Sequence, residues 1–296
     1  MNVINTIKYY LVKSAWICFS CLPLPVMYVF SDALYYPFFY LIRYRRKITR
    51  KNLIAAFPEK NLDEIKKIEK RFYHFFLDLF VETCKYATIS EKEIKKRLKF
   101  VNIEEVNALL RQGQSISTYM GHYCNWEWVT SLPLHLDKGV IASQIYKLLE
   151  SDTMERLLKN NRSRLGAVNV EMKQTMRWIK QQMEEGTTFI TGFISDQSPR
   201  KIDVRYFVKF LNHNAPVFTG TEKITKRYGL AAYYLKVRRV KRGYYEATFV
   251  RLHENPQSLP DFKLTEIYYN HLEEAIKEQP ENYLWTHKRF KHATKL

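Results

Sequence analysis

The chain has 296 residues, and its 48 Lys and Arg against 30 Asp and Glu give a formal charge of +18 at pH 7. Aromatic residues make up 15%, which excludes a disordered or low-complexity chain, and four cysteines are too few for a disulfide-built scaffold. The basic excess predicts an anionic partner, whether nucleic acid, an anionic membrane surface or an acidic protein, and composition does not choose among them.

The N-terminal segment is long and apolar. Residues 14–31 carry no charge, Asp32 interrupts, and residues 33–42 are again uncharged and mostly apolar. This length is near the minimum for a membrane-spanning helix, but Pro23 and Pro25 would kink or break a helix there. We expect the segment either to span a membrane once or to lie in the interface as two short helices. The alternative is a buried hairpin in a soluble protein.

A basic segment follows directly. Residues 43–51 contain six Lys and Arg and no acid. Basic residues beside a membrane segment stay on the cytoplasmic side and attract anionic head groups. We therefore expect Arg43, Arg45 and Arg46 to contact an anionic membrane, with residues 1–50 as the anchor and residues 51–296 as one catalytic or binding domain.

The rest of the chain alternates between helix and strand patterns. Apolar residues at three- and four-residue spacing predict a helix over residues 63–87. Strands are expected at 115–120, 140–145, 188–195, 230–237 and 244–252, and helices at 125–135, 151–162, 172–185, 219–228 and 265–277. This alternation predicts an α/β fold, a single layered domain with a mixed central sheet flanked by helices. Ligands then bind at the carboxyl ends of strands.

A candidate catalytic motif, GHYCNWE, follows the first strand of this domain. Asn125 is a plausible helix N-cap, which would bring Glu127 in the first turn close to His122 in the preceding loop. The chemical interpretation is a His122 general base whose other ring nitrogen is held by Glu127. Because no partner nucleophile is evident, the substrate would supply its own hydroxyl. The alternative is a solvated surface pair.

The chain resembles the bacterial lipid A biosynthesis acyltransferases over nearly its whole length. The resemblance is carried by the order and spacing of several segments. These are RKNLIAAFPEK, GHYCNWEW, IYKLLESDTMERLLKNNRSRLG, FISDQSP, FTGTEKITKRYG, RGYYEATFVRL and PENYLWTHKRFK. The resemblance implies transfer of a fatty acyl chain from acyl carrier protein to a hydroxyl of a lipid acceptor, at the cytoplasmic face of the bacterial inner membrane.

The resemblance also implies roles for particular residues. His122 and Glu127 would be catalytic. Lys147, where the family often has Arg, and Arg162 and Arg164 would bind substrate, one or both arginines at an acceptor phosphate. Each of the three could equally be a solvated surface or helix-end charge.

Asp196 and Gln197 match the family's strand-end pair and are expected to shape the site, although Asp196 could merely cap a turn. Direct transfer without an acyl-enzyme, cofactor or metal is implied. The residues of WTHKR, 285–289, form a family signature whose chemistry the sequence does not explain.

Two further patterns have competing interpretations. Residues 223–245 hold eight basic side chains among tyrosines, which suggests nucleic acid but also describes a half-buried strand hairpin. We expect no nucleic acid and assign Arg238 and Arg239 to contact with acyl carrier protein or the membrane. The apolar stripe of Met172, Met176, Ile179 and Met183 is interpreted as a core face.

Alternative functions remain. An acyltransferase of the same superfamily could use a lysophospholipid, an aminoacyl lipid or a mannosylated lipid as acceptor. A non-catalytic basic membrane or nucleic-acid-binding protein is a different class, and the ordered His122 and Glu127 motif after a strand counts against it.

Overall fold

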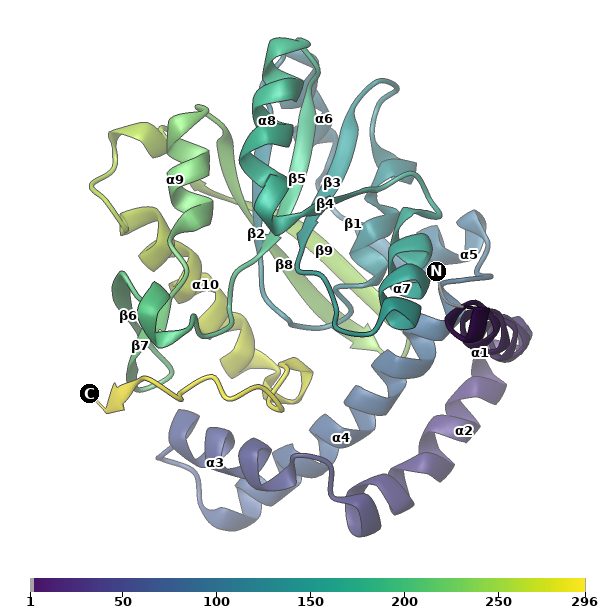
Figure 1. The fold of residues 1–296 in the computed structure, drawn as a ribbon. Coiled ribbons are helices and arrows are strands. Elements are labelled where there is room, and N and C mark those ends of the chain that lie inside the picture. The colour runs from purple at the N-terminus through teal and green to yellow at the C-terminus, as the bar shows by residue number, and fades with distance from the viewer. Residues whose placement is uncertain (1–2, 296) are drawn as a thin grey trace.

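The computed structural model describes residues 3–295 and shows one central sheet with helices on both faces (Figure 1). The α-helices are α1 Val3–Cys21, α2 Leu24–Tyr36, α3 Arg46–Ala56, α4 Leu62–Lys85, α5 Glu91–Arg97, α6 Ile103–Arg111, α7 Asp152–Ser163, α8 Thr175–Glu184, α9 Gly220–Arg227 and α10 Lys263–Glu278. A π-helix, Pro37–Ile42, follows α2, and short 3₁₀ segments occupy Trp128–His135, Met172–Gln174, Lys201–Asp203, Pro256–Ser258 and Pro280–Asn282.

The main sheet has seven strands in the order β1-β9-β8-β2-β5-β3-β4. Neighbours are parallel except for the antiparallel β8–β9 hairpin, so the sheet is mixed. A small antiparallel sheet has the order β10-β7-β6. The strands are β1 Leu98–Phe100, β2 Ile116–Met120, β3 Ile141–Tyr146, β4 Val168–Glu171, β5 Phe189–Ile194, β6 Tyr206–Phe210, β7 His213–Val217, β8 Ala231–Lys241, β9 Tyr244–His253 and β10 Thr294–Lys295.

The predicted fold class, a mixed central sheet flanked by helices, is confirmed. Every residue of β2 is buried, as expected for a central strand covered on both faces. The helix expected at residues 125–135 is wrong in type, since Trp128–His135 is 3₁₀. Pro133 lies inside it, and proline has no N–H for the helical bond and clashes with the preceding turn.

The N-terminal helices pack along α4, which runs beneath the sheet (Figure 1). Asp32, the charge that interrupts the apolar stretch, forms an ion pair with Arg242 at the tip of the β8–β9 hairpin. Asp78 on α4 accepts from the same arginine, at 2.6 Å from Nη2, and from Ser31 on α2. These contacts attach α2 to the β8–β9 hairpin and to α4, and they explain why a carboxylate is tolerated in this segment.

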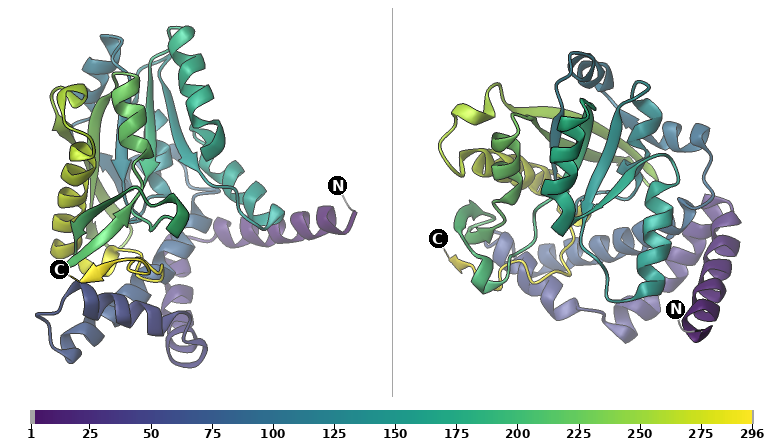
Figure 2. Two further views of the ribbon diagram at one scale, coloured as in Figure 1. Left: turned by 60° about the vertical axis from the view of Figure 1, so that its left-hand side comes forward. Right: turned by 45° about the horizontal axis from the view of Figure 1, so that its top comes forward.

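Both N-terminal helices also expose apolar side chains. Leu11 and Val29 are each 67% exposed, and Leu41 and Ile42 are 78% and 66% exposed. Among residues 3–295, no single helix is both long and apolar enough to cross a membrane, whereas the pair Asn5–Cys21 and Leu24–Ile42, bent by 114°, passes the same test together. Figure 2 shows α1 projecting away from the body of the molecule.

Candidate active site

Two neighbouring parallel strands end at the same level and present the central pair of side chains. In the β2–β5 register Met120 lies opposite Ile194, so the residues two positions later, His122 and Asp196, leave the sheet side by side. The His122 Nδ1 atom lies 2.7 Å from Asp196 Oδ1. The carboxyl ends of adjacent strands thus bring together two residues that are 74 positions apart in sequence.

This pairing fixes the tautomer of the His122 imidazole. An ionised carboxylate only accepts hydrogen bonds, so Nδ1 of His122 donates its proton to Asp196 and Nε2 of the neutral ring carries a lone pair. Burial of Asp196 opposes its ionisation, but the charge and bonds of His122, together with the charge of Arg289, outweigh that effect and hold the pKa of Asp196 below its ordinary value. Nε2 faces the side-chain amide of Gln197 at 3.4 Å, a long contact that a better donor can displace.

The turn after His122 is clamped from two sides. A Cβ on Gly121 would lie 2.7 Å from Leu272 Cδ1 on α10, so a larger residue there would require the Leu272 side chain to move. The C-terminal segment then runs along the turn. The backbone of Leu284 donates to the His122 carbonyl at 3.0 Å, and Cys124 donates to the Asn282 carbonyl at 2.9 Å. The structure therefore gives the PENYLW part of the C-terminal signature a physical role, which is to hold the catalytic turn.

Cys124 is not placed to act as a nucleophile. It is buried, it has a left-handed backbone conformation with φ of 53°, and its thiol donates to the Val237 carbonyl. Burial raises the pKa of the Cys124 thiol, which opposes formation of the nucleophilic thiolate.

The expected contact between His122 and Glu127 is wrong. Both carboxylate oxygens of Glu127 accept from Arg162, at 2.8 Å from Nε and 2.6 Å from Nη2, and one also accepts from the Trp126 indole at 3.1 Å. The Trp126 ring in turn meets the His122 ring edge to face at 5.2 Å between centroids. Glu127 therefore fixes Arg162 and Trp126, and reaches His122 only through the indole.

A buried carboxylate lies behind the same turn. Glu82 on α4 accepts from Asn125 at 2.7 Å, from Tyr245 on β9 at 2.7 Å and from Tyr28 on α2 at 2.6 Å. Asn125 also accepts the backbone N–H of Trp128 at 2.9 Å, but it is not the predicted N-cap, because the 3₁₀ helix begins at Trp128 with Glu127 at the N-cap position. Glu82 thus connects the catalytic turn, the sheet and the N-terminal helices in one hydrogen-bonded unit.

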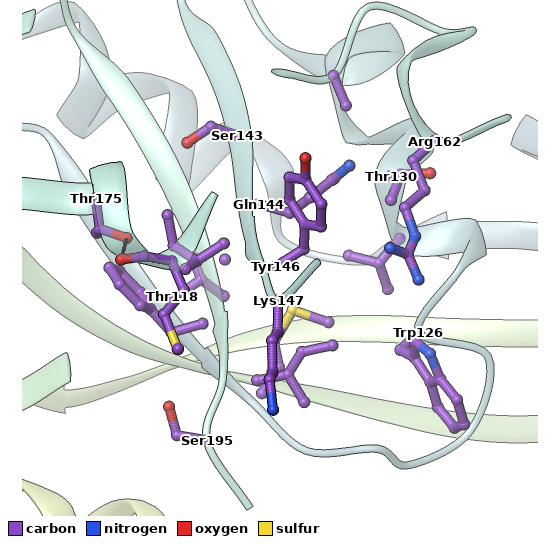
Figure 3. Close-up of a pocket in the computed structure, with 18 of the residues that line it drawn as sticks. Thr118, Trp126, Thr130, Ser143, Gln144, Tyr146, Lys147, Arg162, Thr175 and Ser195 are labelled. Carbon is purple, nitrogen blue, oxygen red and sulfur yellow. Dashed lines mark hydrogen bonds between the residues drawn. The ribbon is translucent and has the colours of Figure 1, made fainter. Parts of the chain in front are cut away.

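A cavity of about 970 Å³ opens beside His122. It extends over the carboxyl ends of β2, β3 and β5, with Thr118 and Thr175 on one side and Arg162 and Trp126 on the other (Figure 3). Most of its lining is apolar, including Met120, Leu132, Ile145, Ile190, Phe193, Phe218 and Leu235. Such a cavity suits an extended apolar group whose reactive end lies at the polar mouth.

Two methionines that line the cavity were predicted to belong to the hydrophobic core instead. Met172 and Met176 line the cavity and are 51% and 37% exposed, while Ile179 in the same stripe is fully buried. The prediction of a uniform core face is wrong, because Met172 in the 3₁₀ segment and Met176 on α8 both line the cavity.

The predicted substrate-binding cations differ in position. Lys147 lines the cavity and forms no ion pair among residues 3–295 (Figure 3). Arg162 also lines it, but its guanidinium is occupied by Glu127. Arg164 lies outside the cavity and donates to the carbonyls of Tyr86 and Ile89 at the end of α4. The expectation that Arg164 meets an acceptor phosphate stays a prediction.

The two basic residues predicted to contact acyl carrier protein or the membrane, Arg238 and Arg239, lie in different environments. Arg238 is exposed and pairs with Glu246 across the hairpin, whereas Arg239 is mostly buried and pairs with Asp78 over the Phe75 ring. Arg239 is an internal ion-pair partner and not a contact surface for another protein.

The three basic residues of the N-terminal segment remain near the surface. Arg43 and Arg45 are exposed, and Arg46 is partly buried beside Glu69. No group of three or more potential metal ligands occurs within residues 3–295.

Two features of the site were not recognised in the sequence. Asp196 was expected near the site, but its bond to His122 depends on which strands are neighbours, and sequence periodicity does not reveal strand order. The role of Trp126 between His122 and Glu127 was also missed, although its place in the motif was a usable signal because a partly buried indole N–H usually finds an acceptor.

Comparison with known proteins identifies one family. The model for the bacterial lipid A biosynthesis acyltransferases matches residues 2–292. No curated protein matches the chain.

Proposed function

Because the chain belongs to the bacterial lipid A biosynthesis acyltransferase family, we propose that it transfers a fatty acyl group from acyl carrier protein to a hydroxyl of a lipid A precursor. The observation that carries the mechanism is the 2.7 Å bond between His122 and Asp196 at the mouth of an apolar cavity. The pair supplies a base, and the cavity supplies a place for the acyl chain.

His122 acts as the general base in this proposal. Its Nε2 takes the proton of the acceptor hydroxyl as the oxygen attacks the thioester carbonyl, so an O–H bond breaks and a C–O bond forms. The tetrahedral intermediate then collapses, the C–S bond breaks, and the leaving thiolate receives the proton from His122. Asp196 holds the ring orientation throughout and stabilises the imidazolium between the two proton transfers.

The oxyanion of the intermediate needs hydrogen-bond donors. The backbone amides of the turn at residues 121–125 are the candidates nearest to His122 in sequence. Two of them are committed elsewhere, since Tyr123 donates to the Gly121 carbonyl and Cys124 donates to Asn282. Lys147, a cation at the cavity without an ion-pair partner among residues 3–295, is the better-placed candidate for charge stabilisation at the mouth.

The apolar cavity is proposed to hold the acyl chain of the donor. Its lining methionines and aromatic side chains exclude water from the thioester, which prevents hydrolysis in place of transfer. The Glu127 and Arg162 pair forms the polar wall where the apolar lining ends.

A membrane location at the cytoplasmic face of the bacterial inner membrane is part of the proposal. It is supported by the exposed apolar side chains of α1 and α2 and by the basic segment that follows them. An amphipathic helix buries its apolar face at the head-group boundary, and a neighbouring cluster of Lys and Arg adds attraction to anionic lipids.

The test is a reconstituted reaction with acyl carrier protein thioester and a lipid A precursor, followed by lipid mass spectrometry. Wild-type protein should add one acyl group to the precursor, and His122→Ala should lower the rate by about 10²–10⁴-fold. The matched control is His253→Ala, which removes a histidine at the far end of β9. Equal rates for wild type and His122→Ala would overturn the proposed mechanism, and acyl transfer only from other thioesters would overturn the proposed donor.

A further inference from the structure

A second cavity, of about 1480 Å³, lies along α3 and is separate from the acyl cavity. Six basic side chains line it, and no carboxylate is among its described lining residues. We call it the basic cleft, and its cations are Arg43, Arg45, Arg46, Lys47, Arg50 and Lys51.

The charges of the basic cleft are only partly balanced. Arg46 and Arg50 both pair with the fully buried Glu69 on α4. The other four cations, Arg43, Arg45, Lys47 and Lys51, are exposed and have no acidic partner within 4.0 Å among residues 3–295. Four unbalanced positive charges in one concave surface repel one another, and this repulsion is relieved when a polyanion enters.

The helix itself adds to this field. The N-terminal end of a helix carries a partial positive charge, so acidic residues normally stabilise the first turn. The first turn of α3 contains no acid and follows Arg45 directly. The arrangement is unfavourable for an isolated helix and favourable for one that binds an anion.

The basic cleft adjoins the catalytic turn through the C-terminal segment. Leu284 donates to the His122 carbonyl at 3.0 Å, and two residues later the Thr286 carbonyl accepts from Arg45 Nη1 at 3.2 Å. Asn52 of α3 donates to the Trp285 carbonyl at 2.8 Å. Because two extended residues span at most about 7 Å, the His122 backbone and the Arg45 guanidinium contact nearby positions of the same short segment.

The basic cleft also begins where the apolar surface ends. Leu41 and Ile42, exposed at 78% and 66%, immediately precede Arg43. A lipid whose chains lie along this apolar surface would carry its polar head group toward the cations.

We propose that the basic cleft binds a phosphate ester on the head group of the lipid acceptor, and so positions the acceptor hydroxyl at His122. The inference rests on the proposed function and assigns the acceptor phosphate to a place other than the acyl cavity. The structure supports this assignment because the charge of Arg162 is already paired with Glu127, and Arg164 lies outside the acyl cavity and donates two bonds to backbone carbonyls.

Lys47 and Lys51 are the residues to change. They lie one turn apart on α3, both are exposed, and neither has a hydrogen-bond partner among residues 3–295, so Lys47→Gln with Lys51→Gln should preserve the fold. The matched control is Lys95→Gln with Lys96→Gln, which removes the same charge from exposed positions at the end of α5.

Binding is measured by sedimentation with zwitterionic vesicles that carry a phosphorylated glycolipid, its dephosphorylated form, or anionic phospholipid of equal total charge. Wild-type protein should prefer the phosphorylated glycolipid to both others. The Lys47/Lys51 variant should lose at least about tenfold of that preference, since charge-assisted bonds to phosphate are among the strongest polar contacts, and the control should keep it.

Steady-state kinetics test the inference independently of binding. The Lys47/Lys51 variant should raise the KM for phosphorylated acceptor, with the KM for the acyl donor unchanged.

Three outcomes would overturn the inference. Equal binding to anionic phospholipid would show that the basic cleft senses only membrane charge. Retained preference in the Lys47/Lys51 variant would place the phosphate elsewhere. A higher KM for the donor instead of the acceptor would make the basic cleft a carrier-protein contact. By contrast, selective binding of the phosphorylated glycolipid without acyl transfer by wild type would refute the proposed function and leave the basic cleft standing.

Discussion

Replacing Asp196 by Asn tests the catalytic pair most directly. The substitution keeps the size of the side chain and removes its charge, and an amide nitrogen facing Nδ1 would favour the wrong imidazole tautomer. The proton then sits on Nε2, where the acceptor hydroxyl must deliver its own. We therefore expect Asp196→Asn to lower kcat while it leaves binding of both substrates nearly unchanged.

The size of the effect follows from the geometry. The imidazolium formed in the reaction has its charge about 4 Å from that of Asp196, given a Nδ1 to Oδ1 distance of 2.7 Å. At an effective dielectric constant of about 20, two unit charges at that distance attract by about 4 kcal/mol. Since about 1.4 kcal/mol is a factor of ten in rate, kcat should fall by about 10³-fold. Asp196 is only 2% exposed, so solvent screens this interaction little.

The assay measures kcat and both KM values with acyl carrier protein thioester and lipid acceptor, with a melting curve for each variant. Glu127→Gln is the companion variant, because it removes a carboxylate that contacts Arg162 and not His122. The fall in kcat caused by Glu127→Gln should not increase when Arg162→Gln is added. The same fall should multiply with the one caused by Asp196→Asn. A kcat for Asp196→Asn within about tenfold of wild type would contradict the proposed role of Asp196. A kcat for the Glu127→Gln, Asp196→Asn double variant no lower than that of either single variant would also contradict it, because Glu127 and Asp196 would then act on His122 as one unit.

Three further outcomes follow from buried groups and from the N-terminal segment. Glu82→Ala should lower the free energy of unfolding by about 3–5 kcal/mol, measured by urea denaturation, because it leaves three buried donors without their acceptor. Burial lowers the pKa of His287 from 6.5 to about 4, so the unfolded chain binds a proton first as the pH falls. Stability should therefore drop by about 3 kcal/mol between pH 7 and 4, and His287→Gln should flatten this slope. Membrane attachment should survive high salt but weaken without residues 1–42, and complete release of the intact protein by salt in a flotation assay would contradict burial of the apolar surface.

Much of the fold was predictable because it depends on local patterns. The five expected strands correspond to β2, β3, β5, β8 and β9, since each is a short apolar or alternating run bounded by turn residues. The pattern did not reveal β1 or β4, which are three and four residues long, nor the small hairpin of β6 and β7. Short strands carry too few residues for a periodic signal, and their positions are set by the neighbours with which they pair.

The residues that belong to the candidate site were easier to predict from the sequence than the contacts between them. His122, Glu127, Lys147, Arg162 and Gln197 all line the acyl cavity. Their partners were not predictable from spacing, because the bond between His122 and Asp196 is set by the β2–β5 register across 74 residues. The same limit applies to Arg239, whose basic neighbours suggested a surface although its carboxylate partner lies on α4.

The geometry around His122 also bears on where the attacking nucleophile comes from. One ring nitrogen is held by Asp196, and the only described side-chain partner of the other is the amide of Gln197, which cannot attack a thioester. Cys124, the nearest thiol in sequence, is buried and bonded to a backbone carbonyl. Ser195 lines the cavity, but its hydroxyl is paired with Thr221 at 2.8 Å. This arrangement supports direct transfer over an acyl-enzyme, because the base is oriented toward a position that no side chain of the described residues fills with a nucleophile. In the proposed reaction the acceptor hydroxyl completes the site, so transfer would require the acceptor lipid to be bound.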